Sequence, residues 1–219
     1  WWCRDWRDAG QEEDFYKSLK IADLETSTHL QVLCNFSILN TIFLKIAEIK
    51  IEKLETARLI LIPYTIPVCK NILLGNVDLL YDKGFVKGKS WPDADVLDTV
   101  PRIIKNLSGN NYSTGFETWI VVKKDTKEII GDAGFKGYNP ASQNVDLGYG
   151  IIAEERGNGY AGEAARQLIN WAFTFDFVKE ITANCLHTNF QSINLLKKLN
   201  FSEVKENENS IYWSLKNTF

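Results

Sequence analysis

The stretch AEERGNGYAGEAARQLINWAF, residues Ala153 to Phe173, decides the fold because it joins two unlike segments. Its first part carries Arg156 and two closely spaced glycines, Gly157 and Gly159. Glycine just before a helix costs chain entropy, so this pair indicates a backbone that must approach something closely. Its second part has apolar residues on one stripe at helical spacing, namely Ala161, Ala164, Ala165, Leu168, Ile169 and Ala172.

Short strands, turns and helices surround this stretch from residue 51 onward. Alternating or continuous apolar runs predict strands over 55–64, 117–124, 128–138, 144–152 and 180–187. Helical periodicity is expected over 96–108, 160–173 and 190–199. A meander of strands, a helix crossover and a further strand together predict an α/β fold, a mixed sheet flanked by helices.

Composition narrows the class of protein. The chain has 219 residues, of which 45% are apolar and 24% charged, as in an ordinary soluble globular domain. A net charge of −3 and the lack of a Lys/Arg run argue against a nucleic-acid partner. The four cysteines form no C-x-x-C pair and there are only two histidines, so we expect no metal site, no disulfide framework and a reducing cytoplasm.

Residues 1–50 differ in texture from the rest, with no proline and one glycine. The apolar run over 32–49 is interrupted by polar and charged residues too often for a membrane span. It fits an amphipathic helix whose stripe holds Leu39, Ile42, Phe43, Ile46 and Ile49. We therefore expect a helical extension, 1–50, that packs on a domain formed by 51–219 or across a homodimer interface and binds no cofactor.

The turn before the 160–173 helix is a candidate phosphate site. A strand is expected to end near Ile152, the turn carries Arg156 to Gly159, and the helix starts at about Tyr160. The first N–H groups of a helix lack intrahelical partners, and the helix dipole adds partial positive charge there. Such a turn binds phosphate, although a glycine-rich turn that merely enters a helix has the same spacing.

Four segments resemble the GNAT family of N-acetyltransferases, in the branch that contains the ribosomal-protein N-terminal acetyltransferases. RGNGYA over 156–161 fits the R/Q-x-x-G-x-G/A signature for acetyl-CoA. IIGDAGFKGY, VDLGYGI, GYAGEAARQLINWAF and NFQSINLLKKLNF resemble this branch in order and spacing. The resemblance extends from about Glu55 to Trp213, and it implies a mostly antiparallel central sheet flanked by helices.

The resemblance also implies a cofactor site. The main chain of Ile151 and Ile152 would meet the pantetheine arm, and the side chain of Asn189 would bind it. Asn189 also suits a helix N-cap, and both roles are compatible. The pyrophosphate would be held by the main chain of Arg156, Gly157, Asn158, Gly159, Tyr160 and Ala161.

One departure from the family bears on mechanism. Many members have a tyrosine seven residues after the asparagine to protonate the leaving thiolate, and this chain has Leu196 there. Ser192, on the first turn of the same helix, is the alternative acid, although serine is also common at helix starts.

Removing a proton from the amine calls for a general base or a water chain. Asp146 is one candidate, because related sequences often have an acidic residue in V-E/D-x-G-Y. Glu117, at the start of a strand pair, is the other, and either carboxylate also fits a plain solvated role. We expect residues 80–111, including Trp91, to shape the acceptor pocket, and Tyr149 to contact substrate.

The sequence thus predicts an acetyl-CoA-dependent N-acetyltransferase that acts on a primary amine, either a protein N-terminus or a small molecule, by direct attack in a ternary complex. A strand-end amide would stabilise the oxyanion. The alternative is a non-catalytic acyl-CoA-binding module, which the missing tyrosine also permits. No metal, nucleic acid or membrane is expected to take part.

Overall fold

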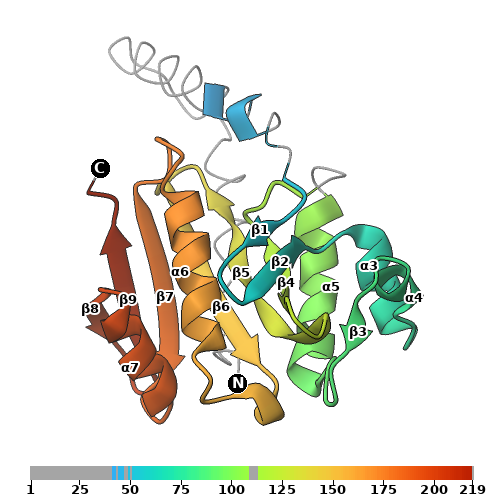
Figure 1. Ribbon diagram of the computed structural model, residues 1–219. Coiled ribbons are helices and arrows are strands. Elements are labelled where there is room, and N and C mark those ends of the chain that lie inside the picture. The colour runs from blue at the N-terminus through green and yellow to red at the C-terminus, as the bar shows by residue number, and fades with distance from the viewer. Residues whose placement is uncertain (1–40, 43, 47–48, 50, 109–112, 219) are drawn as a thin grey trace.

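The computed structural model describes residues 41–42, 44–46, 49, 51–108 and 113–218 (Figure 1). Within these residues a nine-stranded sheet has the order β1-β2-β4-β5-β6-β7-β9-β8, and β3 pairs with β5. All neighbours are antiparallel except β6 with β7 and β3 with β5. The strands are β1 Leu54–Glu55, β2 Leu59–Pro63, β3 Val86–Lys87, β4 Thr118–Lys123, β5 Glu128–Asn139, β6 Asn144–Ile151, β7 Glu180–Leu186, β8 Ser202–Glu206 and β9 Ser210–Lys216.

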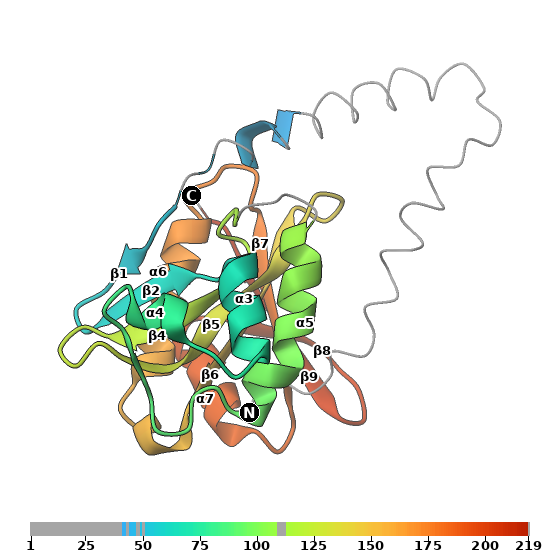
Figure 2. The same ribbon diagram turned by 90° about the vertical axis from the view of Figure 1, so that its right-hand side faces the viewer.

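Helices cover both faces of this sheet. Helix α6 lies over one face, and α3 and α5 lie over the other, as the two perpendicular views show (Figures 1 and 2). Helix α7 lies beside α6, at the end of β7 (Figure 1). The bounds are α3 Ile66–Leu73, α4 Asp78–Tyr81, α5 Ala94–Ser108, η1 Ala153–Glu155, α6 Tyr160–Ala172 and α7 Phe190–Lys198.

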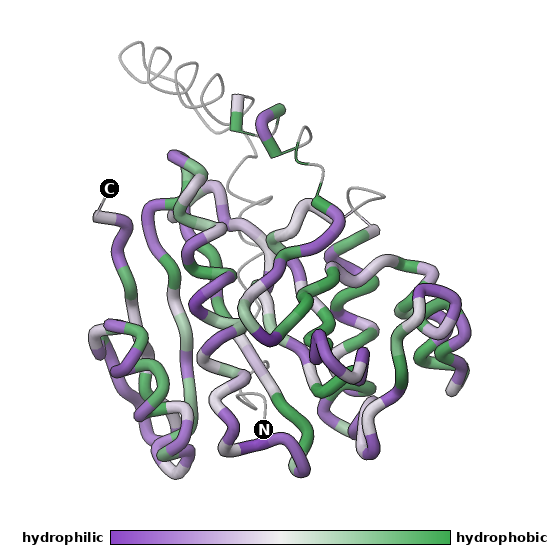
Figure 3. The backbone as a smooth tube through the Cα atoms, viewed as in Figure 1, coloured by the Kyte–Doolittle hydropathy of each residue, from purple (hydrophilic) through white to green (hydrophobic). Residues whose placement is uncertain are grey.

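The sequence patterns account for most of these elements. The strands and helices expected from periodicity beyond residue 51 are present, which confirms the mixed, mostly antiparallel α/β prediction, whereas most of the helix expected within 32–49 lies outside the described residues. The sequence patterns did not predict helices α3 and α4. Helix α3 is short, and its start is defined by Thr65, whose side chain accepts a hydrogen bond from the N–H of Val68. Figure 3 shows hydrophilic and hydrophobic residues alternating along α6 and α7, as amphipathic packing on a sheet requires.

An aromatic cluster fixes the C-terminal end of α6 against the sheet. The Trp171 ring lies 5.0 Å from that of Phe116 and 5.7 Å from that of Trp119, measured between centroids. Phe175 and Phe177, just after the helix, contact Phe116 at 5.4 and 5.9 Å. Because large aromatic side chains bury much area, this cluster holds α6 in a fixed direction, which in turn fixes the position of its N-terminus.

The described part of the N-terminal segment packs on the rest of the chain. Ile42 and Ile46 are buried within the main core, and Lys45 forms an ion pair with Asp176 at 2.9 Å. Leu39 and Phe43 of the expected stripe lie outside the described residues. The division of the chain at residue 50 and the homodimer alternative stay predictions.

Candidate active site

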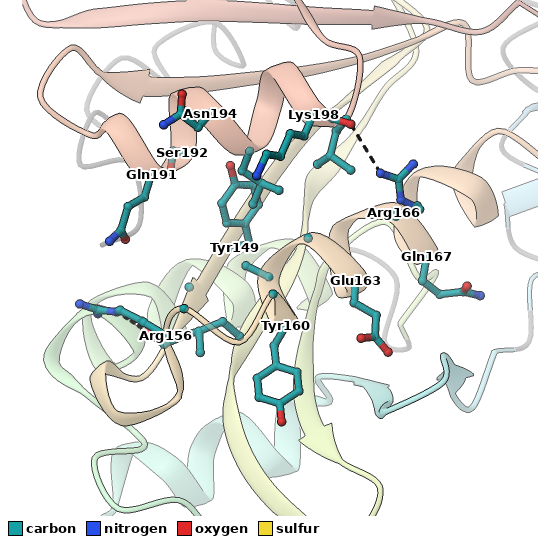
Figure 4. Close-up of a pocket in the computed structure, with 18 of the residues that line it drawn as sticks. Tyr149, Arg156, Tyr160, Glu163, Arg166, Gln167, Gln191, Ser192, Asn194 and Lys198 are labelled. Atoms are coloured by element: carbon teal, nitrogen blue, oxygen red, sulfur yellow. Dashed lines mark hydrogen bonds between the residues drawn. The ribbon is translucent and has the colours of Figure 1, made fainter.

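A groove of about 820 Å³ lies between α6 and α7, above the end of β6. Its floor holds Tyr149, and Ser192, Asn194 and Lys198 project from α7 (Figure 4). The loop before α6 closes one end, with Arg156 on its side of the groove (Figure 4). The glycine loop and the start of α6 therefore form a wall of this groove.

The loop before α6 has the conformation of an anion site. Gly157 and Gly159 have φ of 81° and 80°, in the left-handed region that side chains with a Cβ disfavour. The N-cap Gly159 provides no side-chain cap, and the first helical hydrogen bond of α6 runs from the N–H of Glu163 to the carbonyl of Gly159. The N–H groups of the preceding residues are left for an anion, and the helix dipole adds to their attraction.

Most of the residues expected to bind the cofactor line this groove. Seven do so: Ile151, Arg156, Gly157, Gly159, Tyr160, Ala161 and Asn189. Ile152 does not, since its side chain is buried and its N–H donates to the carbonyl of Ile130. Asn158 does not line the groove either, and its side-chain amide donates to the carbonyl of Glu155.

Arg156 is directed toward the strand before it. Its Nε donates to the carbonyl of Ile151 at 2.8 Å, which ties the loop to the end of β6. This bond leaves one lone pair of that carbonyl available to a ligand. Arg156 therefore orders the strand end as well as adding positive charge beside the loop.

A wedge opens between β6 and β7 below the groove. The two strands pair only where Asn144, Val145 and Asp146 lie opposite Glu180, Ile181 and Thr182. Beyond these residues no ladder pairs are formed between them, although both strands continue. A parallel pair that separates in this way leaves main-chain groups of β6 unpaired on that edge, where an extended ligand can bind.

Asn189 combines the two expected roles. It is the N-cap of α7, where its Oδ1 accepts from the N–H of Ser192 at 3.1 Å, and it also lines the groove. Ser192 lines the groove as well. Leu196, at the position where the family often has tyrosine, is buried in the core.

Asp146 lies at the vertex of the wedge, on the last paired residue of β6. Tyr149, three residues further on, is in the floor of the groove, so alternation puts Asp146 on the opposite face of the sheet. Its Oδ2 accepts from Lys136 Nζ at 2.7 Å, while its Oδ1 is buried and has no hydrogen-bond partner among the described residues. Burial raises the pKa of Asp146, and Lys136 offsets part of this rise.

Glu117 is placed differently from Asp146. It is buried and accepts hydrogen bonds from the N–H groups of Thr114 and Gly115 and from the hydroxyls of Ser113 and Thr114. Burial raises its pKa, and these hydrogen bonds oppose the rise. A carboxylate with this many donors organises the turn before β4, so of the two candidate bases Asp146 has the more open geometry.

Trp91 is fully buried and has no exposed surface in this structure. Its indole N–H donates to Asp132 Oδ2 at 3.2 Å, and the hydroxyl of Tyr64 donates to Asp132 Oδ1 at 2.5 Å. Burial raises the pKa of Asp132 to about 7, against the hydrogen bonds from Tyr64 and Trp91. Sequence reasoning missed Asp132, although a lone acidic residue within the apolar run IIGDAGF was the available signal.

The described residues offer neither a cluster of metal ligands nor a membrane-spanning helix. Across the ranges described, no group of three His, Cys, Asp or Glu side chains could hold a metal ion. A search of the same ranges finds no helix with the length and apolar character needed to cross a membrane.

Comparison with known proteins gives consistent similarities. A sequence profile described as "Acetyltransferase (GNAT) domain" matches residues 78–202. The uncharacterized N-acetyltransferase YjdG of Bacillus subtilis (strain 168) is 36% identical over 148 residues, which cover 68% of this chain and 88% of that protein.

Solved structures show the same fold at low identity. A ribosomal-protein-S5-alanine acetyltransferase from Vibrio fischeri matches with a TM-score of 0.55 at 18% identity, over 76% of this chain and 97% of that one. RimL, a ribosomal L7/L12 alpha-N-protein acetyltransferase in complex with coenzyme A, matches with a TM-score of 0.55 at 13% identity, over 75% and 98%.

Proposed function

The chain belongs to the GNAT family of acetyltransferases and is an N-acetyltransferase, and on that premise we propose that it moves the acetyl group of acetyl-CoA to a primary amine in a ternary complex. The amine attacks the thioester carbon directly, a C–N bond forms, the C–S bond breaks, and coenzyme A leaves as the thiol. Of the cysteines that the structure describes, neither Cys69 nor Cys185 takes part as a nucleophile, since both are buried and neither lines the groove.

The donor is held by the groove between α6 and α7. The open N–H groups that follow Arg156 suit the pyrophosphate, because they combine main-chain donors with the positive end of the helix. The wedge between β6 and β7 suits the pantetheine arm, with the main chain of Ile151 on one side and the Asn189 side chain on the other. A main-chain N–H at the end of β6 stabilises the negative charge that develops on the carbonyl oxygen.

The acceptor amine enters from the face of the sheet opposite the groove. Asp146 lies on that face at the vertex of the wedge, and its raised pKa makes it a better base than an exposed aspartate. It takes the proton of the amine through water, while Lys136 holds the carboxylate in place. Ser192, on the groove side, donates a hydrogen bond to the leaving sulfur.

The acceptor is a protein N-terminus or a small primary amine. Two structural neighbours are named as acetyltransferases of ribosomal proteins, which favours testing N-terminal peptides first. Cys69 and Cys185 are buried and form no disulfide, which suits a cytoplasmic location, where cysteines stay reduced.

One observation carries the proposal: the glycine loop at the start of α6, with its positive φ angles, lines the same groove as the end of β6, where β6 separates from β7. The test is thiol release from acetyl-CoA on incubation with a panel of N-terminal peptides, polyamines and other small amines, with the acetylated product identified by mass spectrometry. Acceptor-dependent thiol release with a matching mass gain is expected. Tight binding of acetyl-CoA without turnover on any amine would instead indicate the non-catalytic module.

A further inference from the structure

Arg58 lies between β1 and β2 but contacts the loop that precedes α6, a hundred residues away in sequence. Its Nη1 donates to the carbonyl of Asn158 at 3.0 Å, and its Nε donates to Glu163 Oε2 at 2.7 Å. The guanidinium carbon lies 4.5 Å from the centre of the Tyr160 ring. One side chain therefore contacts three residues of the segment that forms the expected phosphate site.

The contact with Asn158 fixes the direction of a peptide group. In a trans peptide the carbonyl and the following N–H point in opposite directions. When Arg58 holds the carbonyl of Asn158, the N–H of Gly159 must point away from Arg58. Gly159 has φ of 80° and can adopt other conformations easily, so an external contact is what keeps this N–H in one orientation.

Arg58 offsets the negative charge of Glu163, which would otherwise act against an anionic ligand. Glu163 is on the first turn of α6, where its carboxylate stabilises the helix but repels an anionic ligand at the same end. It accepts from the hydroxyl of Thr56 at 2.5 Å and from the N–H of Arg58 at 2.9 Å, and its Oε2 lies 2.7 Å from Arg58 Nη2. Burial alone would raise the pKa of Glu163, but these partners outweigh it and lower the pKa, so the carboxylate is charged and paired.

The guanidinium also lies against the glycine turn, although Arg58 is not itself among the residues that line the groove. A Cβ placed on Gly159 would lie 3.6 Å from Arg58 Nη2, so the cation is in contact with the glycine turn. The Arg58 side chain is 49% exposed, so it lies at the surface beside the loop. Figure 4 shows Tyr160 and Glu163 on the side of α6 away from α7, and it is on this side that Arg58 lies against the loop.

We propose that Arg58 is a positioning residue for the phosphate end of acetyl-CoA. It orients the loop through the carbonyl of Asn158, and it neutralises Glu163 so that the N-terminus of α6 remains attractive to an anion. This inference rests on the proposed function for the identity of the ligand. In this proposal the phosphate site consists of the glycine loop and of a cation, Arg58, from the β1–β2 hairpin.

The first test compares two donors in the Arg58→Gln variant. Because S-acetylpantetheine lacks the pyrophosphate and the adenosine, a phosphate-specific role predicts a selective loss. We expect KM for acetyl-CoA to rise about tenfold with kcat nearly unchanged, and kcat/KM for S-acetylpantetheine to stay within about twofold of wild type. Equal losses with both donors, or no loss with either, would overturn the proposal.

The matched control is Lys124→Gln. Lys124 also holds this hairpin, but its ammonium bonds to the carbonyl of Thr56 at 2.6 Å and to the Glu55 carboxylate at 2.9 Å and not to residues 156–163. The affinity of Lys124→Gln for acetyl-CoA should stay within about twofold of wild type, since this change affects only the order of the β1–β2 hairpin. A loss as large as that of Arg58→Gln would assign the effect to the hairpin, against the proposal.

The second test adds Glu163→Gln to Arg58→Gln. If Arg58 neutralises Glu163, the single variant leaves a carboxylate without a cationic partner beside the phosphate site, and removing its charge should restore about threefold of the lost affinity. A purely structural network predicts the opposite, a further loss in the double variant. Arg58→Lys keeps the charge but not the planar guanidinium, so its affinity for acetyl-CoA should lie between those of wild type and Arg58→Gln. If Arg58→Gln does not fold, Arg58→Lys replaces it in these comparisons.

Calorimetric titration with coenzyme A separates this inference from the proposed function. Weaker binding of coenzyme A by Arg58→Gln, in a protein that acetylates no amine, would support the role of Arg58 and contradict the enzymatic proposal alone. Unchanged binding in folded Arg58→Gln would overturn the role of Arg58 whether or not the protein is active.

Discussion

Asp146 shows how one residue is tuned by its surroundings. It lies at the vertex of the wedge, where burial raises its pKa and the ammonium of Lys136, 2.7 Å away, opposes that rise. The raised pKa favours proton uptake, whereas the ion pair fixes the position of the carboxylate. The balance between burial and the ion pair with Lys136 determines the pH range in which the Asp146 carboxylate is unprotonated.

Removing the carboxylate should therefore slow the reaction strongly. We expect Asp146→Asn to lower kcat by about 100-fold or more, and Ser192→Ala to lower it less, because a thiolate leaves without much help from an acid. Rates should be measured from about pH 6 to 9.5 with acetyl-CoA saturating. If Asp146→Asn stays near wild type over this range, a water chain is the better candidate for proton removal.

Changing Lys136 tests the same assignment without removing the base. Loss of its positive charge raises the pKa of Asp146 further, so Lys136→Gln should move the acidic limb of the pH–rate profile to higher pH. The plateau rate should change less than in Asp146→Asn. An acidic limb that does not move would mean that the limb belongs to another group, such as the amine itself.

At the scale of elements, the start of α6 depends on a conformation that only glycine adopts easily. Gly159→Val adds a β-branched side chain where φ is 80°, and this side chain also occupies the space in front of Arg58. We expect affinity for acetyl-CoA, measured by calorimetry, to fall by at least about tenfold while the fold persists. Unchanged affinity in the folded variant would remove the loop from the site.

The control for backbone strain is Gly75→Val. Gly75 has φ of 72°, follows α3, and has no atom within 4 Å of an added Cβ. The two variants carry a similar conformational cost, but Gly75 is not among the residues that line the groove. A loss of affinity in Gly159→Val alone would assign the effect to the site.

At the scale of the whole molecule, buried Asp132 couples stability to pH. Burial raises its pKa from 3.8 to about 7, so between these values the folded state binds more protons than the unfolded state. The contribution of Asp132 to the free energy of unfolding should therefore be greatest at low pH. It should fall as the pH rises from about 4 to about 7. The loss is on the order of 4 kcal/mol at about 1.4 kcal/mol per pKa unit.

Urea unfolding at several values between about pH 5 and 8 measures this dependence. Asp132→Asn cannot ionise, so its stability should show a shallower fall over this range, even though it loses one of the hydrogen bonds from Tyr64 and Trp91. Asp125→Asn, in the exposed turn before β5, should keep the slope of wild type. Parallel pH profiles for wild type and Asp132→Asn would show that Asp132 does not titrate in this range.

Local sequence determined the elements, and it predicted the phosphate loop. Periodicity placed the main strands and helices, and the glycines at 157 and 159 predicted the close approach, because backbone freedom and helix polarity are local properties. Asn189 was likewise readable as a cap. Tertiary structure alone decided which polar side chains meet, since Arg58 and Glu163, or Trp91 and Asp132, lie far apart in sequence and are joined by strand order and packing. Whether a carboxylate is a candidate base, like Asp146, or fully engaged in a turn, like Glu117, depends on its burial and partners, and these exist only once the sheet has formed.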